Sequence, residues 1–201
     1  REIGRLPIQV MHGELDGKTL KALSPDLMVV AVGGRPLKIE GPGFENEKVI
    51  SAWDVLFRKK EAGSRVVIIG GGQVGLETAH FLLEEGKEIT VLEMLKRVGQ
   101  DMSPRARRMV LEALVQNGAE ILTEAKALSV ENGEVVFNRA GVVDRIKGVD
   151  SIVVAVGTAP QEVGNLDLGR SGVPIRWIGD ASVPRKLFDA IHEGYNVAIE
   201  I

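Results

Sequence analysis

Cysteine is absent from all 201 residues of the chain. This absence excludes structural disulfides, a redox-active dithiol, and zinc or iron–sulfur sites held by thiolates of this chain. Any redox chemistry therefore needs an organic cofactor or a further stretch of polypeptide. The three histidines lie far apart in the sequence and lack the spacing of metal ligands, so we expect no metal site.

Long apolar runs are also missing. The apolar runs at Leu27–Val32 and Val66–Ile69 are far shorter than the roughly 20 residues that a membrane-spanning helix requires. No apolar segment of signal-peptide length follows the first residues, which favours a cytoplasmic location. The chain begins with Arg1 rather than methionine, and we therefore expect it to be part of a longer polypeptide.

The sequence has no excess of basic charge either. Lys and Arg number 25 against 28 Asp and Glu, which gives a formal net charge of −3. The basic residues are scattered among carboxylates, so nucleic acid and anionic membranes are not expected as partners. A hydrophobic content of 44% and a charged content of 26% are typical of a globular protein.

Two segments of the chain repeat each other. Residues 26–36 (DLMVVAVGGRP) and 150–160 (DSIVVAVGTAP) share an Asp, a Val-Val-Ala-Val-Gly run and a Pro in register. Each segment predicts a strand buried on both faces of a parallel sheet, followed by a Gly turn and a Pro that stops the strand. The alternative is that two buried strands of an α/β protein simply share valines.

This repeat predicts a divided domain organisation. The second copy closes a complete nucleotide-binding unit, whereas few residues precede the first copy. If both strands close homologous domains, the first domain lacks its opening strand, glycine-rich turn and helix. We therefore expect one whole domain at residues 64–159, inserted into a truncated domain made of residues 1–50 and 160–201.

The middle of the chain has the pattern of a dinucleotide site. Residues 65–69 are mostly β-branched, residues 70–75 are rich in glycine, and residues 76–86 have apolar side chains at helical spacing. In this order, Gly70 permits a tight turn, Gly72 lets the backbone approach a pyrophosphate, and Gly75 lets the helix pack on the strand. The free amides and the positive dipole end of the helix would then hold the phosphates.

An acidic residue follows the second strand of this unit. Lys87–Glu93 predicts that strand, and Glu93 lies near the spacing of about 20 residues at which a carboxylate accepts hydrogen bonds from the adenosine ribose. A carboxylate there favours NAD(H), although Lys96 and Arg97 are close enough in sequence to admit NADP(H). The alternative is a Rossmann-like fold whose site is vestigial or empty.

The following elements complete an α/β unit. Ser103 as N-cap and Pro104 at the first helical position predict a helix that ends at Asn117-Gly118. A third strand is expected at residues 119–122, and an antiparallel meander is expected at residues 127–130, 134–137 and 142–146. The last parallel strand, residues 150–156, ends at Gly157 on the sheet edge where ligands of such folds bind.

Four passages make the chain resemble the flavoprotein family with two dinucleotide-binding domains, typified by the pyridine nucleotide–disulfide oxidoreductases. The resemblance is nearest to the C-terminal FAD- and NAD(P)-binding region of 2,4-dienoyl-CoA reductase and trimethylamine dehydrogenase-type NADH:flavin oxidoreductases. Residues 25–36 are similar to the family's Ala-Thr-Gly strand, with Val32 in place of Thr, and residues 70–77 are similar to its nicotinamide fingerprint. Residues 93–101 are similar to the segment after the ribose acid. Residues 177–195 are similar to the flavin-contacting Gly-Asp and the helix after it.

The resemblance implies a fold and a relay of electrons. The implied fold class is α/β, with a Rossmann-like parallel sheet and an antiparallel β-meander crossover inserted in a truncated second Rossmann-like domain of the FAD type. Reduced nicotinamide would pass a hydride to FAD, and electrons would cross an iron–sulfur cluster to FMN in a preceding barrel domain. In the family the flavin pyrophosphate lies on an earlier glycine turn that is not part of this sequence, so FAD is expected in the parent enzyme and the isolated chain is expected to be inactive.

The resemblance and the motifs together give two groups of candidate cofactor-binding residues. The candidates for nicotinamide dinucleotide are Gly70, Gly72, Gln73, Val74, Gly75, Glu77, Glu93, Met94, Arg97, Val156 and Gly157. The candidates near the flavin are Ala31, Val32, Gly33, Gly179 and Asp180. Glu77 would position the nicotinamide ring or, as a first-turn acid, complement the helix dipole. Asp180 would accept a hydrogen bond from a ribityl hydroxyl or merely start a turn, and no catalytic residue is identified.

Other functions are compatible with the same motifs. One is a nucleotide-binding Rossmann module that acts as a sensor or docking domain without redox turnover. Another is a self-sufficient nicotinamide dehydrogenase, which is less favoured because no residue set supplies a substrate-side acid or a hydride acceptor. The expected partners are a nicotinamide dinucleotide and the flavin and FMN-barrel regions of the parent enzyme.

Overall fold

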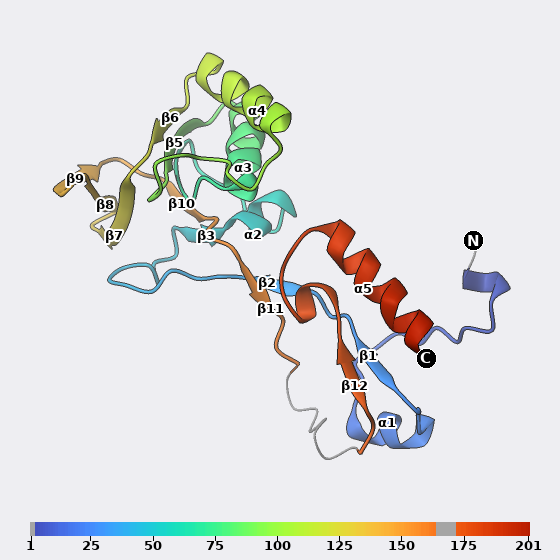
Figure 1. Cartoon of the computed structure of the whole chain (residues 1–201). Helices are drawn as coiled ribbons and strands as arrows, with labels where there is room; N and C mark the ends of the chain where they lie inside the picture. The colour runs from blue at the N-terminus through green and yellow to red at the C-terminus, as the bar shows by residue number, and fades with distance from the viewer. Residues whose placement is uncertain (1–2, 164–171) are drawn as a thin grey trace. The chain divides into compact units, whose positions relative to one another are not determined.

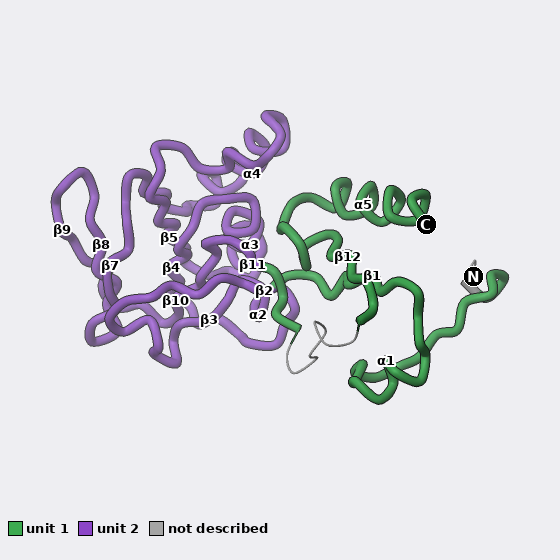
Figure 2. The backbone as a smooth tube through the Cα atoms, turned by 60° about the horizontal axis from the view of Figure 1, so that its bottom comes forward, with its two compact units in different colours: residues 1–34, 160–201 green, residues 35–159 purple. Residues whose placement is uncertain are grey.

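The chain folds into two compact units in a computed structural model that describes residues 3–163 and 172–201 (Figure 1). Residues 35–159 form unit 2, and residues 1–34 together with 160–201 form unit 1 (Figure 2). The chain thus begins in unit 1, builds the whole of unit 2 and returns to unit 1. In the part of the chain that is described, every helix is too short or too polar to cross a membrane.

Unit 2 is built on a five-stranded parallel sheet with the strand order β3-β10-β4-β5-β6. Its strands are β3 (Val49–Ser51), β4 (Arg65–Ile69), β5 (Glu88–Leu92), β6 (Glu120–Leu122) and β10 (Ser151–Val154). The three central strands are rich in Val and Ile and are buried nearly throughout, as in parallel sheets covered on both faces. Ile69 of β4 pairs with Val154 and Leu92 at the carboxyl ends of its neighbours, so these ends share one edge of the sheet.

Alternate side chains of β4 pack into two different cores, because successive residues of a strand point to opposite faces. Val66 and Ile68 pack with the helices α2 (Ala52–Leu56), α3 (Gln73–Glu84) and α4 (Pro104–Gln116). Val67 and Ile69 pack with the strands β7 (Ala125–Glu131) and β8 (Glu134–Arg139). Unit 2 therefore has three layers, with helices on one face of the parallel sheet and a meander on the other.

The predicted meander and the predicted helix that precedes it in the chain are confirmed. β7, β8 and β9 (Val142–Ile146) form a three-stranded antiparallel sheet. Asn132 and Gly133 join β7 to β8 with φ angles of 51° and 77°, the two positive values that a type I′ hairpin turn requires. Ser103 Oγ accepts the Ala106 N–H at 3.3 Å and caps α4. The expected α/β class with a parallel sheet and a meander is therefore correct.

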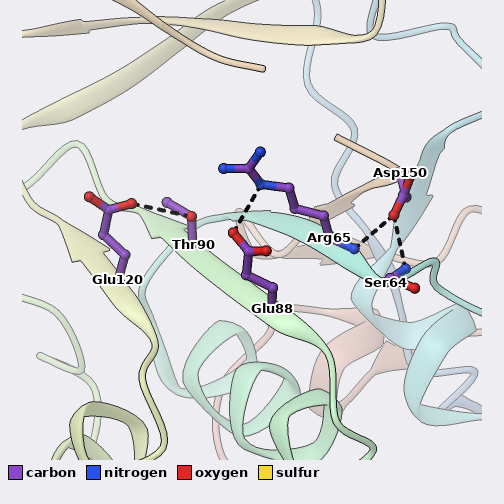
Figure 3. Close-up of polar contacts among 6 residues, drawn as sticks. All are labelled: Ser64, Arg65, Glu88, Thr90, Glu120 and Asp150. Atoms are coloured by element: carbon purple, nitrogen blue, oxygen red, sulfur yellow. Dashed lines mark hydrogen bonds and ion pairs between the residues drawn. The ribbon is translucent and has the colours of Figure 1, made fainter. Parts of the chain in front are cut away.

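The carboxylate of Asp150 accepts hydrogen bonds at the amino ends of the parallel strands, at the edge of the sheet opposite their carboxyl ends. Asp150 Oδ2 accepts the N–H groups of Ser64 and Arg65 at 3.1 and 2.9 Å (Figure 3). Beside it, Arg65 forms an ion pair with Glu88 at 3.0 Å. Asp150 thereby joins the first residues of β4 to the segment that leads into β10.

We predict that Asp150→Ala lowers the free energy of unfolding by about 1 kcal/mol, because two backbone donors lose their acceptor at an exposed position. Urea denaturation measures this change. The affinity for any ligand at the carboxyl edge should stay as in the wild type, because Asp150 lies at the other end of the strands. A change in that affinity with no change in stability would contradict the assignment of Asp150 to the fold.

Unit 1 contains a smaller parallel sheet. β1 (Met28–Val30) pairs with β12 (Ile175–Trp177), and Ile178 N–H donates to Val30 O at 3.0 Å. The helix α1 (Gly17–Leu23) precedes β1, and the short helix η3 (Gly179–Ala181) leads from β12 toward α5 (Leu187–Glu200). The remaining short elements are η1 (Ile3–Arg5) and the paired strands β2 (Gly34–Pro36) and β11 (Thr158–Pro160), through which the chain passes from one unit to the other.

The unit boundary differs from the one expected from the sequence. Residues up to 50 were assigned to the truncated domain, but the compact units divide between Gly34 and Arg35. The physical reason is that β3 pairs with β10 and that Ala52 and Val55 of α2 are buried in the core of unit 2. The two repeated strands also end earlier than expected, at Val30 and Val154.

Candidate functional site

A glycine turn joins β4 to α3 at the carboxyl edge of the sheet. Gly70 has a φ of +108°, which favours glycine, and a Cβ there would lie 2.4 Å from Ala155 O. A Cβ at Gly75 would lie 1.9 Å from Gly70 O, so the helix could not sit this close to the turn with any other residue. These two glycines are therefore required by the packing of α3 against β4 and β10.

Gly72 is placed differently from the other two glycines. It is the N-cap residue of α3, with an extended backbone that any residue adopts (φ −73°, ψ −175°) and no side chain to cap the helix. The atom nearest to a Cβ at this position is an oxygen of Asp101, at an ordinary contact distance of 3.4 Å. The packing therefore does not require glycine here, and glycine leaves no side chain in front of the helix.

A carboxylate already lies at the head of α3. Both oxygens of Asp101 accept the Gln73 N–H, at 2.9 and 3.0 Å. Sequence reasoning did not single out Asp101, although it ends the segment 93–101 that carried the family resemblance. Its contact with Gln73 is a tertiary contact, and local sequence patterns do not predict such contacts.

Glu93 lies at the end of β5, where the sequence placed it. Its side chain is 8% exposed, and its two oxygens accept the N–H groups of Gly71 and Leu95 at 2.7 and 2.8 Å. A Cβ at Gly71 would lie 2.6 Å from a methyl carbon of Val98, so this third glycine of the turn is also required. The carboxylate is therefore held rigidly beside the glycine turn.

These groups line one pocket of about 480 Å³ within unit 2. The carboxyl ends of β4, β5 and β10, the start of β7, the head of α3 and Trp53 contribute to it. The predicted site residues found in its lining are Gly70, Gly72, Gln73, Val74, Glu93, Met94, Val156 and Gly157. Lys126 and Asp101 also line it, and neither was among the predicted residues.

Three of the candidates for nicotinamide dinucleotide do not line this pocket. Gly75 is buried under the turn and serves the packing of the helix. Glu77 is exposed on α3 and accepts a hydrogen bond from Gln73 Nε2 at 2.9 Å. Arg97 is exposed in the segment after β5. Of the residues that the structure describes, no group of His, Cys, Asp or Glu side chains is arranged to hold a metal ion.

The flavin candidates come together in unit 1. Ala31, Gly33, Gly179 and Asp180 line a pocket of about 330 Å³ at the ends of β1 and β12, whereas Val32 is 51% exposed and does not line it. Asp180 Oδ1 accepts the Arg185 N–H at 3.1 Å. This contact fits the alternative interpretation, in which Asp180 starts a turn. Gly179 N–H donates to Glu193 of α5 at 2.6 Å, and Glu193 also pairs with Arg185.

Known proteins similar to this chain are redox enzymes. An NADH oxidase from Thermoanaerobacter brockii is 36% identical over 209 residues, which cover 100% of this chain and 32% of that protein. A metal reductase from Desulforamulus reducens is 34% identical, over 86% of this chain and 30% of that protein. Among solved structures, a 2-naphthoyl-CoA reductase complex has a TM-score of 0.87 and 29% identity, and the alignment covers 100% of this chain and 31% of that one.

The chain therefore spans about a third of the length of these relatives. It also matches the family described as pyridine nucleotide-disulphide oxidoreductase over residues 8–187, which include all of unit 2 and part of unit 1. This match confirms the family predicted from the sequence, while the narrower likeness to the 2,4-dienoyl-CoA reductase type stays a prediction. The chain belongs to the pyridine nucleotide-disulphide oxidoreductase family.

Proposed function

We propose that this chain provides the nicotinamide-dinucleotide-binding portion of a flavin-dependent oxidoreductase. One observation carries the proposal: the glycine turn at the head of α3 opens on a pocket that also contains Glu93 at the end of the next strand. Helix N-termini bind phosphate through free N–H groups and the positive end of the dipole. A carboxylate at the end of the second strand suits the hydroxyl groups of a ribose.

Each part of the pocket suits a different part of a dinucleotide. Gly72, Gln73 and Val74 would hold the pyrophosphate, because they form the open side of the glycine turn. Glu93 and Met94 would contact the adenosine ribose. Val156 and Gly157 follow β10 at the same edge and would lie beside the nicotinamide. When bound, reduced nicotinamide supplies a hydride, and the residues of this chain orient it.

The pocket favours NADH over NADPH. Glu93 is buried and held by two backbone N–H groups, so its carboxylate cannot turn away from a ligand at low cost. A 2′-phosphate on the ribose would bring a second negative charge toward it. Arg97 is exposed and outside the pocket lining, although a flexible arginine there would serve an NADPH site. Separate calorimetric titrations with NADH and NADPH test this preference.

Unit 1 is proposed as part of a flavin domain. Its parallel strands β1 and β12 end at a pocket with Asp180, whose carboxylate would accept a hydrogen bond from a ribityl hydroxyl. FAD in the whole enzyme would take the hydride from reduced nicotinamide. The relatives' names, an NADH oxidase and two reductases, support such an electron path.

The exposed surface of α5 supports a larger parent enzyme. Leu187, Phe188, Ile191, Tyr195 and Ile199 of this helix are each more than 60% exposed. Such an apolar helix face is normally covered by protein. We propose that the remainder of the flavin domain covers it, and that an FMN-binding barrel of the 2,4-dienoyl-CoA reductase type completes a cytoplasmic enzyme.

A nucleotide-binding module without redox turnover is the alternative. The two functions differ when NADH is supplied to the full-length enzyme that contains this sequence, with FAD bound and an artificial electron acceptor present. NADH oxidation by the full-length protein supports the redox function. Tight NADH binding without any reduction of the flavin would support the sensor or docking function instead.

Glu93→Gln should weaken NADH binding about tenfold, the scale of losing a hydrogen bond to a charged acceptor. NADPH binding should fall less or rise, because the repulsion between Glu93 and a 2′-phosphate disappears. The ratio of the two affinities, measured by calorimetry, is the readout, since general damage to the fold would lower both alike. An unchanged ratio would contradict the placement of the ribose beside Glu93.

A further inference from the structure

The head of α3 is held by a side chain from a distant loop. Gly72 offers no side chain to cap the helix, and Asp101 supplies the acceptor for the Gln73 N–H with both of its oxygens, at 2.9 and 3.0 Å. A carboxylate at this position satisfies a backbone donor that has no partner within the helix, and it interacts favourably with the positive end of the dipole. Asp101 thus caps a helix of which it is not part.

The loop that carries Asp101 is fixed against the glycine turn. Gly99 N–H donates to Gly71 O at 2.7 Å, and Met102 N–H donates to Gly99 O at 3.2 Å. Arg107 of α4 donates from Nε to Val98 O at 2.6 Å, and this hydrogen bond attaches the loop to α4. The carboxylate is therefore placed at the helix head by several tertiary contacts.

The same donor would serve the pyrophosphate in the proposed function. A phosphate oxygen that accepts the Gln73 N–H would lie next to the Asp101 carboxylate, because two acceptors of one N–H are neighbours. Two of the described residues that line the pocket are anionic, Glu93 and Asp101, and Lys126 is cationic. Like charges at contact distance repel, and the repulsion is stronger where water is partly excluded.

We propose that Asp101 is a positioning residue with two opposed effects, an inference that rests on the proposed function. Its carboxylate holds the phosphate-binding turn in the free protein, and its negative charge weakens the binding of the dinucleotide. To bind, the pyrophosphate must share the Gln73 N–H with Asp101 or displace the carboxylate from it. The cap thereby lowers the affinity of the site for its ligand.

Asp101→Asn separates the two effects, because asparagine caps helices about as well as aspartate but carries no charge. NADH is titrated by calorimetry into the wild type, D101N and the control Asp144→Asn at low and at high salt. Asp144 lies on β9 outside the pocket lining, so its loss changes the net charge equally. D101N should bind NADH about tenfold more tightly at low salt, whereas the control should stay within about twofold of the wild type.

The salt dependence excludes a merely structural effect. The gain in D101N should shrink at high salt, because screening weakens the repulsion in the wild type. A D101N affinity equal to or weaker than that of a wild type that binds NADH overturns the role of Asp101 and leaves the proposed function standing. So does a tighter affinity that salt does not change.

Inorganic pyrophosphate gives a readout that is independent of NADH. It should raise the midpoint of thermal unfolding of D101N more than that of the wild type, because only the anion-binding head of α3 is probed. If no variant binds NADH but this difference is found, the proposed function fails, whereas the weakening of anion binding at the head of α3 by the Asp101 charge stands. If pyrophosphate affects both proteins equally, the role of Asp101 fails.

Discussion

Gly75→Ala should lower the free energy of unfolding of unit 2 by about 3 kcal/mol or more, at the upper end of the cost of overpacking a core. The added Cβ would lie 1.9 Å from the carbonyl oxygen of Gly70 and 3.4 Å from the Ala155 Cβ. A backbone carbonyl cannot swing aside as a flexible side chain would, so α3 has to move away from β4. That movement would loosen Leu76 and Leu82, which are 0% and 1% exposed in the core below the helix.

Urea denaturation followed by circular dichroism measures this loss, and Gly72→Ala is the matched control. Gly72 lies in the same turn, has an extended backbone, and would bring its new Cβ no closer than 3.4 Å to another atom. The control should stay within about 1 kcal/mol of the wild type, the scale of changing an N-cap residue. Equal midpoints for G75A and the wild type would mean that α3 does not pack this closely on the turn.

The parts of the fold that the sequence predicts are those with strong local signals. The run of Val and Ile at β4, the glycines after it and the apolar spacing of α3 specify a strand, a turn and a helix without any knowledge of their neighbours. Ser103 with Pro104 and Asn132 with Gly133 are equally local signals, and the structure has the helix cap and hairpin turn that they predict. The neighbouring order of β4, β5 and β6 then follows from the short helical crossovers between these consecutive strands.

The parts that the sequence does not predict depend on tertiary contacts. β3 has only three residues, too few to show a period, and it exists because it pairs with β10. For the same reason the boundary between the units was placed too far along the chain. A strand this short is stabilised by its partner rather than by its own composition.

The candidate site also has features that the sequence predicts and features that depend on tertiary contacts. The spacing of Glu93 from the glycines placed it correctly at the end of β5, but nothing local indicated that Gly71 and Leu95 would hold its oxygens. The sequence pattern assigned Gly70, Gly72 and Gly75 different roles, and the structure adds that the packing requires Gly70 and Gly75, whereas a Cβ at Gly72 would come no closer than 3.4 Å to another atom, an oxygen of Asp101. Asp101 was missed because its partner Gln73 is 28 residues away in the chain.

The second prediction with a large expected effect is a substitution at Gly72, and it concerns ligand binding rather than stability. Gly72→Val should keep the fold, because its φ of −73° and ψ of −175° suit a β-branched residue and its Cβ would come no closer than 3.4 Å to another atom, an oxygen of the Asp101 side chain. The branched side chain would stand in front of the N–H groups at the head of α3, where the pyrophosphate is proposed to lie. Calorimetry should show NADH affinity reduced at least about 100-fold, equivalent to about 2.7 kcal/mol.

The stability measurements on the same variant make this result decisive. A folded Gly72→Val protein with its unfolding midpoint near that of the wild type, yet without NADH binding, would locate the diphosphate at the head of α3. Gly72→Ala should show a smaller loss of affinity, because one methyl group fills less of the space that the phosphate needs. If Gly72→Val is folded and still binds NADH with wild-type affinity, the dinucleotide does not lie on this turn, because a valine at the N-cap and a phosphate at the same N–H groups cannot occupy one volume.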